Sequence, residues 1–382
     1  MKIEKINRTI EGNFVTISAK ISDLPDGKYD TLWYKFPKEL NQFIPDRHDP
    51  LFVAMLGVSL KEDKPMIIEG EMSERLLMSG AYQFANIWKT HFKEISSQLK
   101  IQATKKPSRK NFRGSATAMF FTGGVDSFYT LLKNLDNEKG DGRISHLIYA
   151  HSGFDTISDN TDVLVNISKH LQEIANAFNL KLIFVTTNLK IITDRYIDWD
   201  WSHGACIASV GLWLSPLFKY IYFASDMTYS GCNRIRIWGN HNLITPLWST
   251  ESTQFIDDGS EATRPQKIQW RIAKSDIALK HLRVCYRNTD NRYNCCQCEK
   301  CLRTMTTLHI AGILQHCKTF DKALDYERIS NVSLILSKAI FIEDNDMYWK
   351  ENLDFLEQQG NYDPKLKLIL TEVLEKHTKL LQ

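Results

Sequence analysis

A short stretch around two adjacent glycines constrains this chain more than any other part of its sequence. The apolar run at 116–121 stops at Gly123 and Gly124, and apolar residues then recur at helical spacing from Val125. Glycines allow the backbone to approach an anion closely, and the free N–H groups at the start of a helix favour negative charge. The spacing differs from GxxxxGK[ST], so the phosphate loop of kinases and GTPases is not indicated. The stretch predicts a phosphate cradle, or else an ordinary strand-to-helix turn that contains two glycines.

The side chains around this turn suit the same chemistry. Thr122 and Ser127 add hydroxyl donors beside the predicted anion. Asp126 places a carboxylate among groups that otherwise suit phosphate, which makes chemical sense if a divalent cation lies between them. We therefore expect a metal-assisted phosphate site at the junction of strand and helix.

Composition sets the class of protein. The chain has 382 residues, enough for about two or three domains. Its 48 basic and 45 acidic residues give a net charge of +3, so no general basic field favours nucleic acid as a partner. Residues 1–13 lack the apolar core of a secretion signal, and the most apolar stretch, 205–218, contains Pro216 and is too short to span a bilayer. We expect a cytoplasmic protein without a membrane partner.

The chain divides into four parts by pattern. Residues 1–103 contain β-type runs and one amphipathic helix, which indicates an N-terminal α+β domain of unknown role. The basic, polar stretch 104–114 predicts a linker. From 115 to 317 apolar strands alternate with helices, which predicts an α/β fold with a doubly wound parallel sheet. Residues 318–382 form a helical region that either docks on the chain or binds a partner. Strands are expected at 14–21, 31–36, 66–68, 144–150, 181–187 and 220–225, and helices at 76–92, 163–178 and 203–214.

Ligands of such sheets bind beyond the carboxyl ends of the strands. Three groups of residues fall there: the glycine turn, the segment from His151 to Asp155, and Ser225 with Asp226. His151 either contacts a ligand or is only hydrogen-bonded at the strand end. Asp155 and Asp226 are expected to line the crevice with carboxylates.

A group of cysteines forms the second motif. Four of the eight cysteines lie within seven residues, which favours metal binding in a reducing compartment over a disulfide framework. Cys285, Cys295, Cys298 and Cys301 follow the order C-x9-C-x2-C-x2-C and supply the four thiolates of a closed tetrahedral Zn²⁺ site. An iron–sulfur cluster is an alternative. Cys296 is a fifth thiol and leaves the register open, although the even spacing favours Cys295.

Both motifs resemble those of one enzyme family. TGGVDS at 122–127 is similar to the SGGxDS signature of the PP-loop ATP pyrophosphatases. The cysteine segment 284–303 is similar to the zinc segment of the 7-cyano-7-deazaguanine synthase (QueC) family of the queuosine pathway, in which glycine takes the place of Cys296. The resemblance covers roughly residues 116–316.

The resemblance implies an ATP-dependent ligase that uses Mg²⁺. ATP would adenylate the carboxylate of 7-carboxy-7-deazaguanine with release of pyrophosphate, ammonia would displace AMP to give an amide, and a second adenylation with dehydration would give the nitrile. The turn's N–H groups and the metal ion would stabilise the leaving pyrophosphate. Asp126 and Ser127 would be the catalytic residues. The implied ATP contacts are Phe121, Thr122, Gly123, Gly124, Val125, Asp126, Ser127 and His151.

Two additions distinguish the chain from ordinary family members. More than 100 residues precede the glycine turn, and the segment 238–271 replaces a shorter substrate loop. The chain is similar in this respect to the longer QueC-like proteins of antiphage operons, such as the QatC group. That likeness implies another amine acceptor, such as the N-terminus of a protein from the same operon. The candidate substrate contacts are Asp226, Asp257, Asp258, Arg264 and Lys267.

Two other functions stay open. A scaffold that binds nucleotide without catalysis could serve as a subunit of a defence complex. A PP-loop enzyme that modifies tRNA is the second alternative. The near-neutral charge and the lack of a basic patch interleaved with aromatic residues disfavour it.

Overall fold

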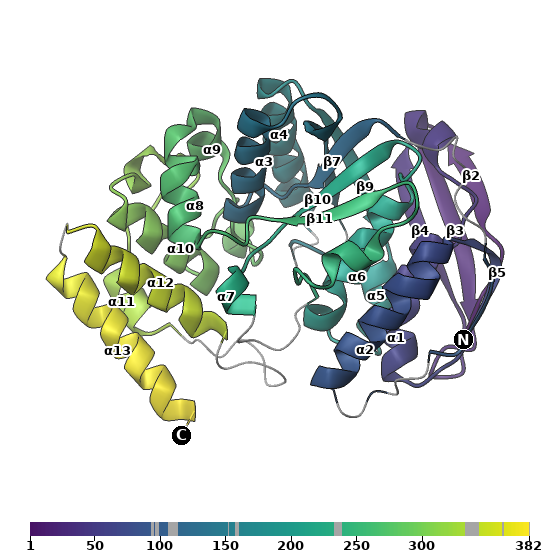
Figure 1. The fold of residues 1–382 in the computed structure, drawn as a ribbon. Coiled ribbons are helices and arrows are strands. Elements are labelled where there is room, and N and C mark those ends of the chain that lie inside the picture. The colour runs from purple at the N-terminus through teal and green to yellow at the C-terminus, as the bar shows by residue number, and fades with distance from the viewer. Residues whose placement is uncertain are drawn as a thin grey trace.

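One mixed, mostly parallel sheet of eleven strands forms the centre of an α/β fold (Figure 1). The computed structural model describes residues 1–92, 95, 99–105, 114–151, 153–156, 160–232, 239–332, 344–360 and 363–381. Residues 106–113 of the predicted linker lie outside this set. The strands are β1 (Lys2–Ile3), β2 (Asn7–Glu11), β3 (Phe14–Ser22), β4 (Asp30–Pro37), β5 (Met66–Met72), β6 (Ile101–Lys105), β7 (Ala116–Phe120), β8 (Ile144–Ala150), β9 (Lys181–Thr187), β10 (Phe218–Ala224) and β11 (Gln254–Asp258).

The five strands that follow residue 115 are parallel to one another. Their order is β11-β10-β7-β8-β9, so the chain starts in the middle with β7, builds outward to β9 and returns to the other side of β7 with β10. Parallel sheets with such a reversal bind ligands at the reversal point, beyond the carboxyl ends of the central strands. Here that point lies between β7 and β10, and the glycine turn follows β7 directly.

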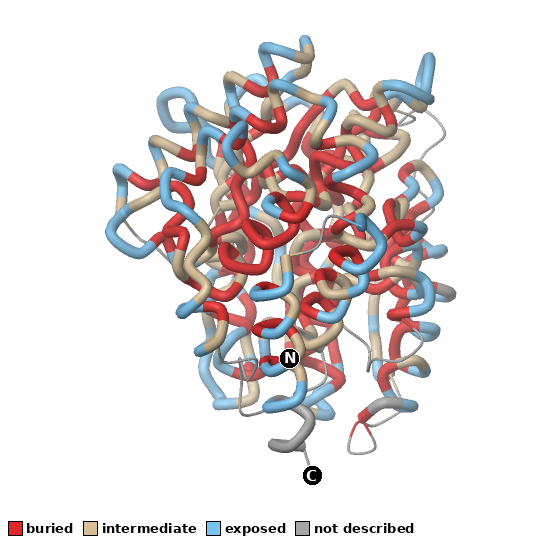
Figure 2. The backbone as a smooth tube through the Cα atoms, turned by 90° about the vertical axis from the view of Figure 1, so that its left-hand side faces the viewer, coloured by how far each residue is buried: buried red, intermediate tan, exposed pale blue. Residues whose placement is uncertain are grey.

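Helices cover both faces of these parallel strands. Ala118 of β7 and Ile148 of β8 pack in one hydrophobic cluster, whereas their neighbours Met119 and Leu147 pack in another. The two-residue period of a strand explains this alternation. Figure 2 shows the buried residues concentrated in the interior. The helices are α1 (Asp49–Lys61), α2 (Tyr82–His91), α3 (Val125–Asn137), α4 (Thr161–Ala177), α5 (Leu189–Thr193), α6 (Trp199–Leu212), α7 (Tyr229–Cys232), α8 (Arg264–Trp270), α9 (Asp276–His281), α10 (Glu299–Ile310), α11 (Tyr326–Ser330), α12 (Asp344–Gln358) and α13 (Pro364–Leu381).

The N-terminal strands continue the same sheet. β4 pairs with β9 in antiparallel orientation, with Tyr34 opposite Thr187, and β3, β1, β5 and β6 follow in that order. The first 105 residues contain both strands and helices, as expected of an α+β unit, but their strands do not form a separate sheet. In Figure 1 these strands lie at one end of the molecule, and the C-terminal helices lie at the other.

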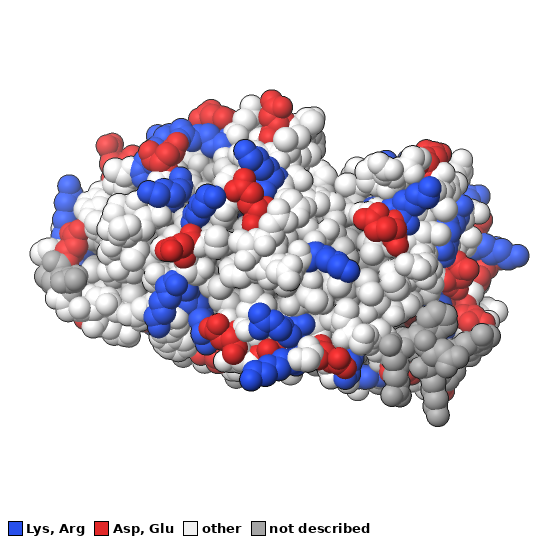
Figure 3. Space-filling view, turned by 90° about the horizontal axis from the view of Figure 1, so that it is seen from above, with Lys and Arg blue, Asp and Glu red and all other residues white. Residues whose placement is uncertain are grey.

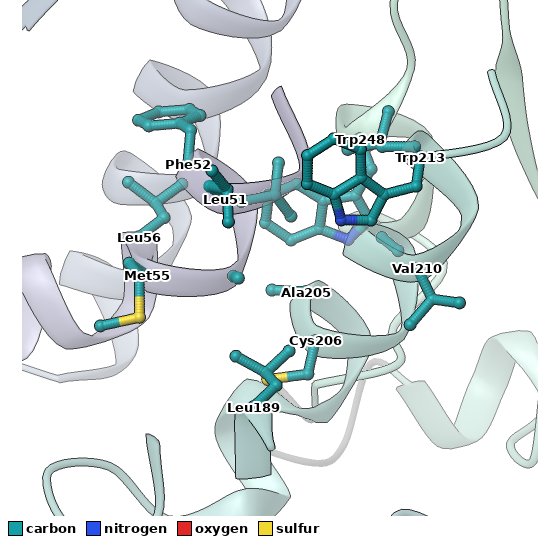
Figure 4. Packing of buried hydrophobic residues seen from close by; sticks show 14 of the residues in the cluster. Leu51, Phe52, Met55, Leu56, Leu189, Ala205, Cys206, Val210, Trp213 and Trp248 are labelled. Carbon is teal, nitrogen blue, oxygen red and sulfur yellow. The ribbon is translucent and has the colours of Figure 1, made fainter. Parts of the chain in front are cut away.

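The sequence pattern does not reveal α1, which packs against α6. Twelve of its 13 residues are buried, so the helix has no polar face and no amphipathic period. A helix that is apolar all round is typical of a buried position. Figure 4 shows its side chains beside residues of α6 and the two tryptophans that follow; the labelled residues of this contact are Leu51, Phe52, Met55, Leu56, Ala205, Cys206, Val210, Trp213 and Trp248.

The C-terminal helices dock on the chain's own α10. Trp349 of α12 donates its indole N–H to the carboxylate of Glu299 at 3.0 Å, and Asn352 donates to the carbonyl of Arg303 at 3.0 Å. Leu366 and Leu370 of α13 are fully buried in a third hydrophobic cluster. Of the two alternatives for this region, intramolecular docking is therefore the one observed.

Replacing Phe52 by alanine tests whether both ends of the sheet unfold together. Phe52 is fully buried in α1, and truncation of a buried phenylalanine costs about 3–5 kcal/mol of unfolding free energy. Because one sheet joins both parts of the chain, we expect one unfolding transition at a lower urea concentration than in the wild type. Circular dichroism and tryptophan fluorescence would measure it, with Phe14→Ala, at a residue that is 46% exposed, as the control. Two separate transitions would contradict the joint unfolding.

Candidate functional site

The glycine turn joins β7 to α3 at the reversal point of the sheet. Gly123 has a φ of +78°, which residues with a Cβ rarely adopt, and Gly124 is the N-cap of α3. Because Gly124 has no side chain that could cap the helix, it leaves the first-turn N–H groups available to a ligand. Thr122 places its hydroxyl oxygen against this position, where a Cβ on Gly124 would approach it to 3.3 Å. Ser127 donates its hydroxyl to the Gly124 carbonyl at 3.1 Å.

Two residues of the predicted ATP segment have their side chains in the hydrophobic core. Phe121 is fully buried and contacts Phe128 edge-on at 5.1 Å between ring centroids, and Val125 is buried in the same cluster. Only the backbone of these two residues could therefore reach a ligand. This finding restricts the predicted contacts to main-chain atoms at both positions.

Asp126 lies between two cations from α8. Arg264 donates to Oδ2 at 3.1 and 3.3 Å, and Lys267 donates to Oδ1 at 2.9 Å. Lys267 also donates to the carbonyl of Ser225 at 2.5 Å. The structure thus brings one predicted catalytic residue and two predicted substrate residues into a single ion-pair network.

These contacts decide the charge of the carboxylate. Burial would raise the pKa of Asp126, but the charges and hydrogen bonds of Arg264 and Lys267 outweigh it and hold the pKa well below its usual range. Both carboxylate oxygens accept charged hydrogen bonds, so the geometry does not offer Asp126 to a divalent cation. The expected Mg²⁺ contact therefore does not fit this arrangement.

The three aspartates near β10 and β11 have different surroundings. Asp258 accepts from Thr130 at 2.8 Å and pairs with Lys133 at 2.8 Å, so it fastens β11 to α3. Asp257 accepts from Ser260 at 3.1 Å, and burial with the nearby charge of Asp226 raises its pKa to about 6. The buried Oδ1 of Asp226 has no hydrogen-bond partner among the described residues. Asp226 and Asp257 thus stay candidates for a ligand, and Asp258 has a structural role.

The segment after β8 carries two of the predicted ligand-binding residues, His151 and Asp155. The backbone N–H of His151 donates to Val185 at 2.8 Å, which places His151 at the carboxyl edge of the sheet; its contact with ATP stays a prediction. Asp155 pairs with Arg283 and accepts from Tyr149 at 3.3 Å. Arg283 is almost fully buried, so this ion pair fixes the loop after β8 to the chain that precedes the cysteines.

Two cations near the turn come from the cysteine segment, and the sequence analysis did not assign them a role. Lys300 and Arg303 lie in the first turns of α10, between and after the last two cysteines. Burial, together with the charges of Arg264 and Arg303, lowers the pKa of Lys300 to about 8. The sequence signal that could have found them is the pair of basic residues in CEKCLR, directly beside the proposed metal ligands.

Helix α12, in the C-terminal region, also contacts Arg264 and Arg303. The ring of Tyr348 lies 4.1 Å from the guanidinium carbon of Arg264 and 4.1 Å from that of Arg303. Glu351 accepts from the backbone N–H of Arg264 at 3.2 Å, and burial raises its pKa to about 7. Residues from a region without a predicted site therefore hold both arginines in place.

Four cysteines form a group that could bind a metal ion such as zinc. Cys285, Cys295, Cys298 and Cys301 are all buried, and their sulfur atoms lie within 4.8 Å of one another. Two of the sulfur pairs are 3.9 Å apart, close to the roughly 3.8 Å expected for thiolates around tetrahedral zinc. Backbone N–H groups of Asn288 and Cys298 donate to two of these sulfurs at 3.1 and 3.3 Å. These donors would stabilise negative thiolates.

The structure decides whether Cys295 or Cys296 belongs to the group of four cysteines. Cys296 has a φ of +58°, in the left-handed region that favours glycine, and its sulfur lies 3.6 Å from the carboxylate of Asp321 instead of among the other four. Cys295, favoured by spacing, belongs to the group of four.

Hydrogen bonds connect the cysteine segment to the glycine turn. The backbone N–H of Arg283 donates to the Gly123 carbonyl at 2.8 Å. The side chain of Asn294 accepts from the N–H groups of Val284 and Cys285 at 2.9 and 3.2 Å, which closes the loop between Cys285 and Asn294. Folding of the cysteine segment therefore positions one wall of the turn.

Comparisons of the chain with family models, with curated proteins and with solved structures found no match. In the part of the chain that the structure describes, no helix combines the length and the hydropathy needed to cross a bilayer.

Metal content should distinguish Cys295 from its neighbour. Because Cys295 supplies one of four converging sulfurs, we expect Cys295→Ser to lower bound zinc from about one per chain to well below one and to lower the melting temperature. Cys296→Ser, which changes an adjacent buried thiol outside the group, should retain the metal. Inductively coupled plasma mass spectrometry of the purified proteins would measure this. Equal zinc in both variants would contradict the assigned ligands.

The Asp126 ion pairs should appear in the pH dependence of stability. Asp126→Asn leaves Arg264 and Lys267 without their carboxylate, so we expect the unfolding free energy at pH 7 to fall by about 3 kcal/mol. The stabilisation is complete above the pKa of aspartate in the unfolded chain, about 4, and is lost as pH falls toward the lower folded pKa.

Urea denaturation at several pH values would measure this difference between wild type and variant. The difference in unfolding free energy between the wild type and Asp126→Asn should stay constant from about pH 8 to pH 5 and shrink below about pH 4. Asp136→Asn is the matched control, because Asp136 pairs with Arg271 at a side chain that is 62% exposed, and we expect less than about 1 kcal/mol there. A difference that grows on acidification would contradict the assignment.

Proposed function

We propose that the chain is an ATP-consuming ligase that activates the carboxylate of a 7-deazaguanine. The observation that carries the proposal is the position of the glycine turn. It lies at the reversal point of a parallel sheet and at the N-terminus of α3, with Arg264 and Lys267 beside it. Sheets of this kind bind nucleotides at this position. The deazaguanine part rests on the resemblance of TGGVDS and the cysteine segment to one family.

The proposed reaction begins with adenylation. A carboxylate oxygen of the substrate attacks the α-phosphorus of ATP, the bond to the β-phosphate breaks, and pyrophosphate leaves with the electron pair. An amine then attacks the acyl adenylate, the C–O bond to AMP breaks, and a proton is lost as the amide forms. With ammonia as the amine, a second ATP activates the amide oxygen, and loss of AMP and protons gives the nitrile. No side-chain nucleophile is required.

The residues of the chain would act through position and charge. The first-turn N–H groups of α3 would hold phosphate oxygens, and Arg264 and Lys267 would stabilise negative charge on the leaving pyrophosphate. Asp126 would keep both cations in place rather than bind a metal ion. The hydroxyls of Thr122 and Ser127 would complete the cradle.

The group of four cysteines would have a structural role. Four thiolates close the coordination sphere of Zn²⁺, which adds binding energy to folding and leaves no position for water. The same segment carries the Arg283 N–H that contacts Gly123. A closed metal site would thus hold the turn and take no part in bond making.

A nucleotide-binding scaffold without catalysis is the second candidate, and one observation favours it. The acidic residue of the motif, Asp126, is engaged as a structural ion pair, and a scaffold needs only the anion-binding backbone and its neighbouring cations. Asp126→Ala would also remove the countercharge of the buried Lys267, so loss of activity in that variant would not prove catalysis.

A tRNA-modifying function has less support. Positive and negative side chains are interspersed on the face seen in Figure 3. On that face, the described residues do not form the basic surface that backbone phosphates require, and the net charge is only +3.

The adenylation reaction provides the direct test. Purified protein with Mg-ATP and 7-carboxy-7-deazaguanine should release AMP and pyrophosphate in equal amounts, measured by a coupled pyrophosphate assay and chromatography. Arg264→Met should lower kcat/KM by about 100-fold, because a cation that stabilises the leaving group is lost. Arg271→Met changes a half-buried arginine at the end of α8 that pairs with Asp136 instead of Asp126, and it should leave the rate unchanged. The ligase proposal would be wrong if the substrate caused no release above background.

The same reaction mixtures identify the acceptor. With ammonium present, mass spectrometry should detect the amide or the nitrile. If AMP forms but neither product does, a protein amine is the acceptor, and a covalent deazaguanine adduct on a protein from the same operon would show it.

A further inference from the structure

Two histidines from different helices share a hydrogen bond beside the glycine turn. His170 of α4 and His281, the last residue of α9, face each other with their Nδ1 atoms 2.8 Å apart. The His281 side chain is 1% exposed, so the contact lies away from solvent. One nitrogen must donate and the other must accept, because each neutral imidazole carries one N–H and one lone pair. The two Nδ1 atoms therefore share a single proton.

The surroundings indicate which ring donates. Nε2 of His281 lies 3.7 Å from a carboxylate oxygen of Glu173, and this negative charge favours a proton on Nε2. Nδ1 of His281 is then the acceptor, and His170 donates its Nδ1–H. The pair keeps this hydrogen bond when one ring is charged. A proton on both Nδ1 atoms would instead place two N–H donors and two positive charges against each other.

Gly123 of the turn lies against atoms that depend on this pair. A side-chain carbon at Gly123 would meet the carbonyl oxygen of His281, the hydroxyl of Tyr293 and a methyl group of Leu171, each at 3.8 Å. Tyr293 donates to that carbonyl at 3.2 Å, and its ring stacks on the ring of His170 at 4.1 Å between centroids. Leu171 follows His170 in α4. The histidine pair and its neighbours thus form one wall of the turn.

The backbone after His281 extends this contact into the turn. Two residues further on, the N–H of Arg283 donates to the Gly123 carbonyl at 2.8 Å. The Leu282 carbonyl between them accepts from the Asn294 side chain at 2.9 Å. A movement of His281 away from its partner would therefore shift the residues that hold the turn.

Burial and nearby lysines oppose positive charge on the pair. Burial lowers the pKa of His281 to about 4, and His170 and Lys280 add to this shift while Glu173 opposes it. Burial also lowers the pKa of His170, where Glu173 opposes the shift and Lys169 and Lys280 add to it. Protons thus bind the two rings more readily once the pair has separated and reached water.

An open groove beside His170 contains the other charged groups that face the pair. The charged residues that line it are Lys280, Arg292, Lys318 and Asp321. Arg292 pairs with Asp321, and Lys280 pairs with Glu173 at 3.4 Å. Both carboxylates of this surface are therefore engaged with cations, and Glu173 is the one that also faces the ring of His281.

We propose that His170 and His281 are positioning residues that hold the glycine turn in its ligand-binding conformation, and that a second proton on the pair releases the turn. The pair acts through residues 281–283 and Tyr293 and takes no part in bond making. That the ligand is a nucleotide rests on the proposed function, whereas the coupling between the pair and the turn rests on the contacts around Gly123.

Hydrogen exchange of the full-length protein, measured by mass spectrometry, tests this coupling without any ligand. The contribution of the pair is complete above the pKa of histidine in the unfolded chain, about 6.5, and is lost as pH falls toward the lower folded value. After correction for intrinsic rates, protection of peptides covering 121–127 and 281–285 should fall by about tenfold or more between pH 7.5 and pH 5. Protection of β3 should stay unchanged, which excludes global unfolding.

Two variants of His170 and one control assign the effect to the pair. His170→Asn retains an N–H donor near the position of Nδ1 and can turn its oxygen toward a protonated His281. We therefore expect wild-type protection at pH 7.5 and loss of most of the pH dependence. His170→Leu removes the donor and should lower protection of both peptides already at pH 7.5. His316→Asn, at an exposed histidine of η8 (Leu314–His316), should behave as the wild type does.

The outcomes separate this inference from the proposed reaction. Equal protection of the turn at both pH values in the wild type, or an unchanged pH dependence in His170→Asn, would overturn the inference and leave ligase activity untouched. Added protection of the turn by Mg-ATP at pH 7.5 that is weaker in His170→Leu would support it. A turn that loosens with acid as expected, in a protein that binds no Mg-ATP, would support the coupling and remove the proposed ligand.

Discussion

The half-buried carboxylate of Asp126, paired with the buried Lys267, is the constraint on which the arrangement of the site depends. A buried charge costs several kcal/mol unless opposite charges and hydrogen bonds surround it. Its two partners, Arg264 and Lys267, lie 138 and 141 residues further along the chain, so this one group joins α8 to α3. Arg264 then contacts Tyr348, and its backbone N–H bonds Glu351, which extends the same constraint to α12. One acidic residue thereby connects three helices that are distant in sequence.

The cysteine segment applies a second constraint to the same turn from the opposite side. The hydrogen bonds from the Arg283 N–H to Gly123 and from the Val284 N–H to the Asn294 side chain do not depend on any side chain in the glycine motif. A metal ion bound by the four sulfurs would stiffen this segment and, with it, the position of Gly123. The glycines allow the turn's conformation, and its surroundings select it. A strand-to-helix turn with two glycines would otherwise be free to adopt several conformations.

Much of the fold could be predicted from the sequence wherever local pattern decides it. The strands at 144–150 and 181–187 have the predicted bounds, because each is an apolar run ended by polar residues. α1 could not be recognised, since a helix buried on all sides has no period, and β11 lies in a polar segment whose aspartates suggested a loop. The pairing of β4 with β9 joins residues about 150 apart, which no local pattern records. The four cysteines were predictable because their ligand spacing is itself local.

The ion pairs of the candidate site also could not be predicted from the local sequence. The motif predicts that Asp126 and a phosphate share a site, but it cannot show that Arg264 and Lys267 already neutralise the carboxylate. Once they do, the other arginines near the turn also have carboxylates, Arg283 with Asp155 and Arg303 with Glu299. Buried N–H groups of these arginines nevertheless have no acceptor among the described residues. Local arrangements that cost stability are expected where a ligand supplies the missing partner. The unpaired donors next to an uncapped helix start are therefore better explained by an anion than by the packing of the free chain.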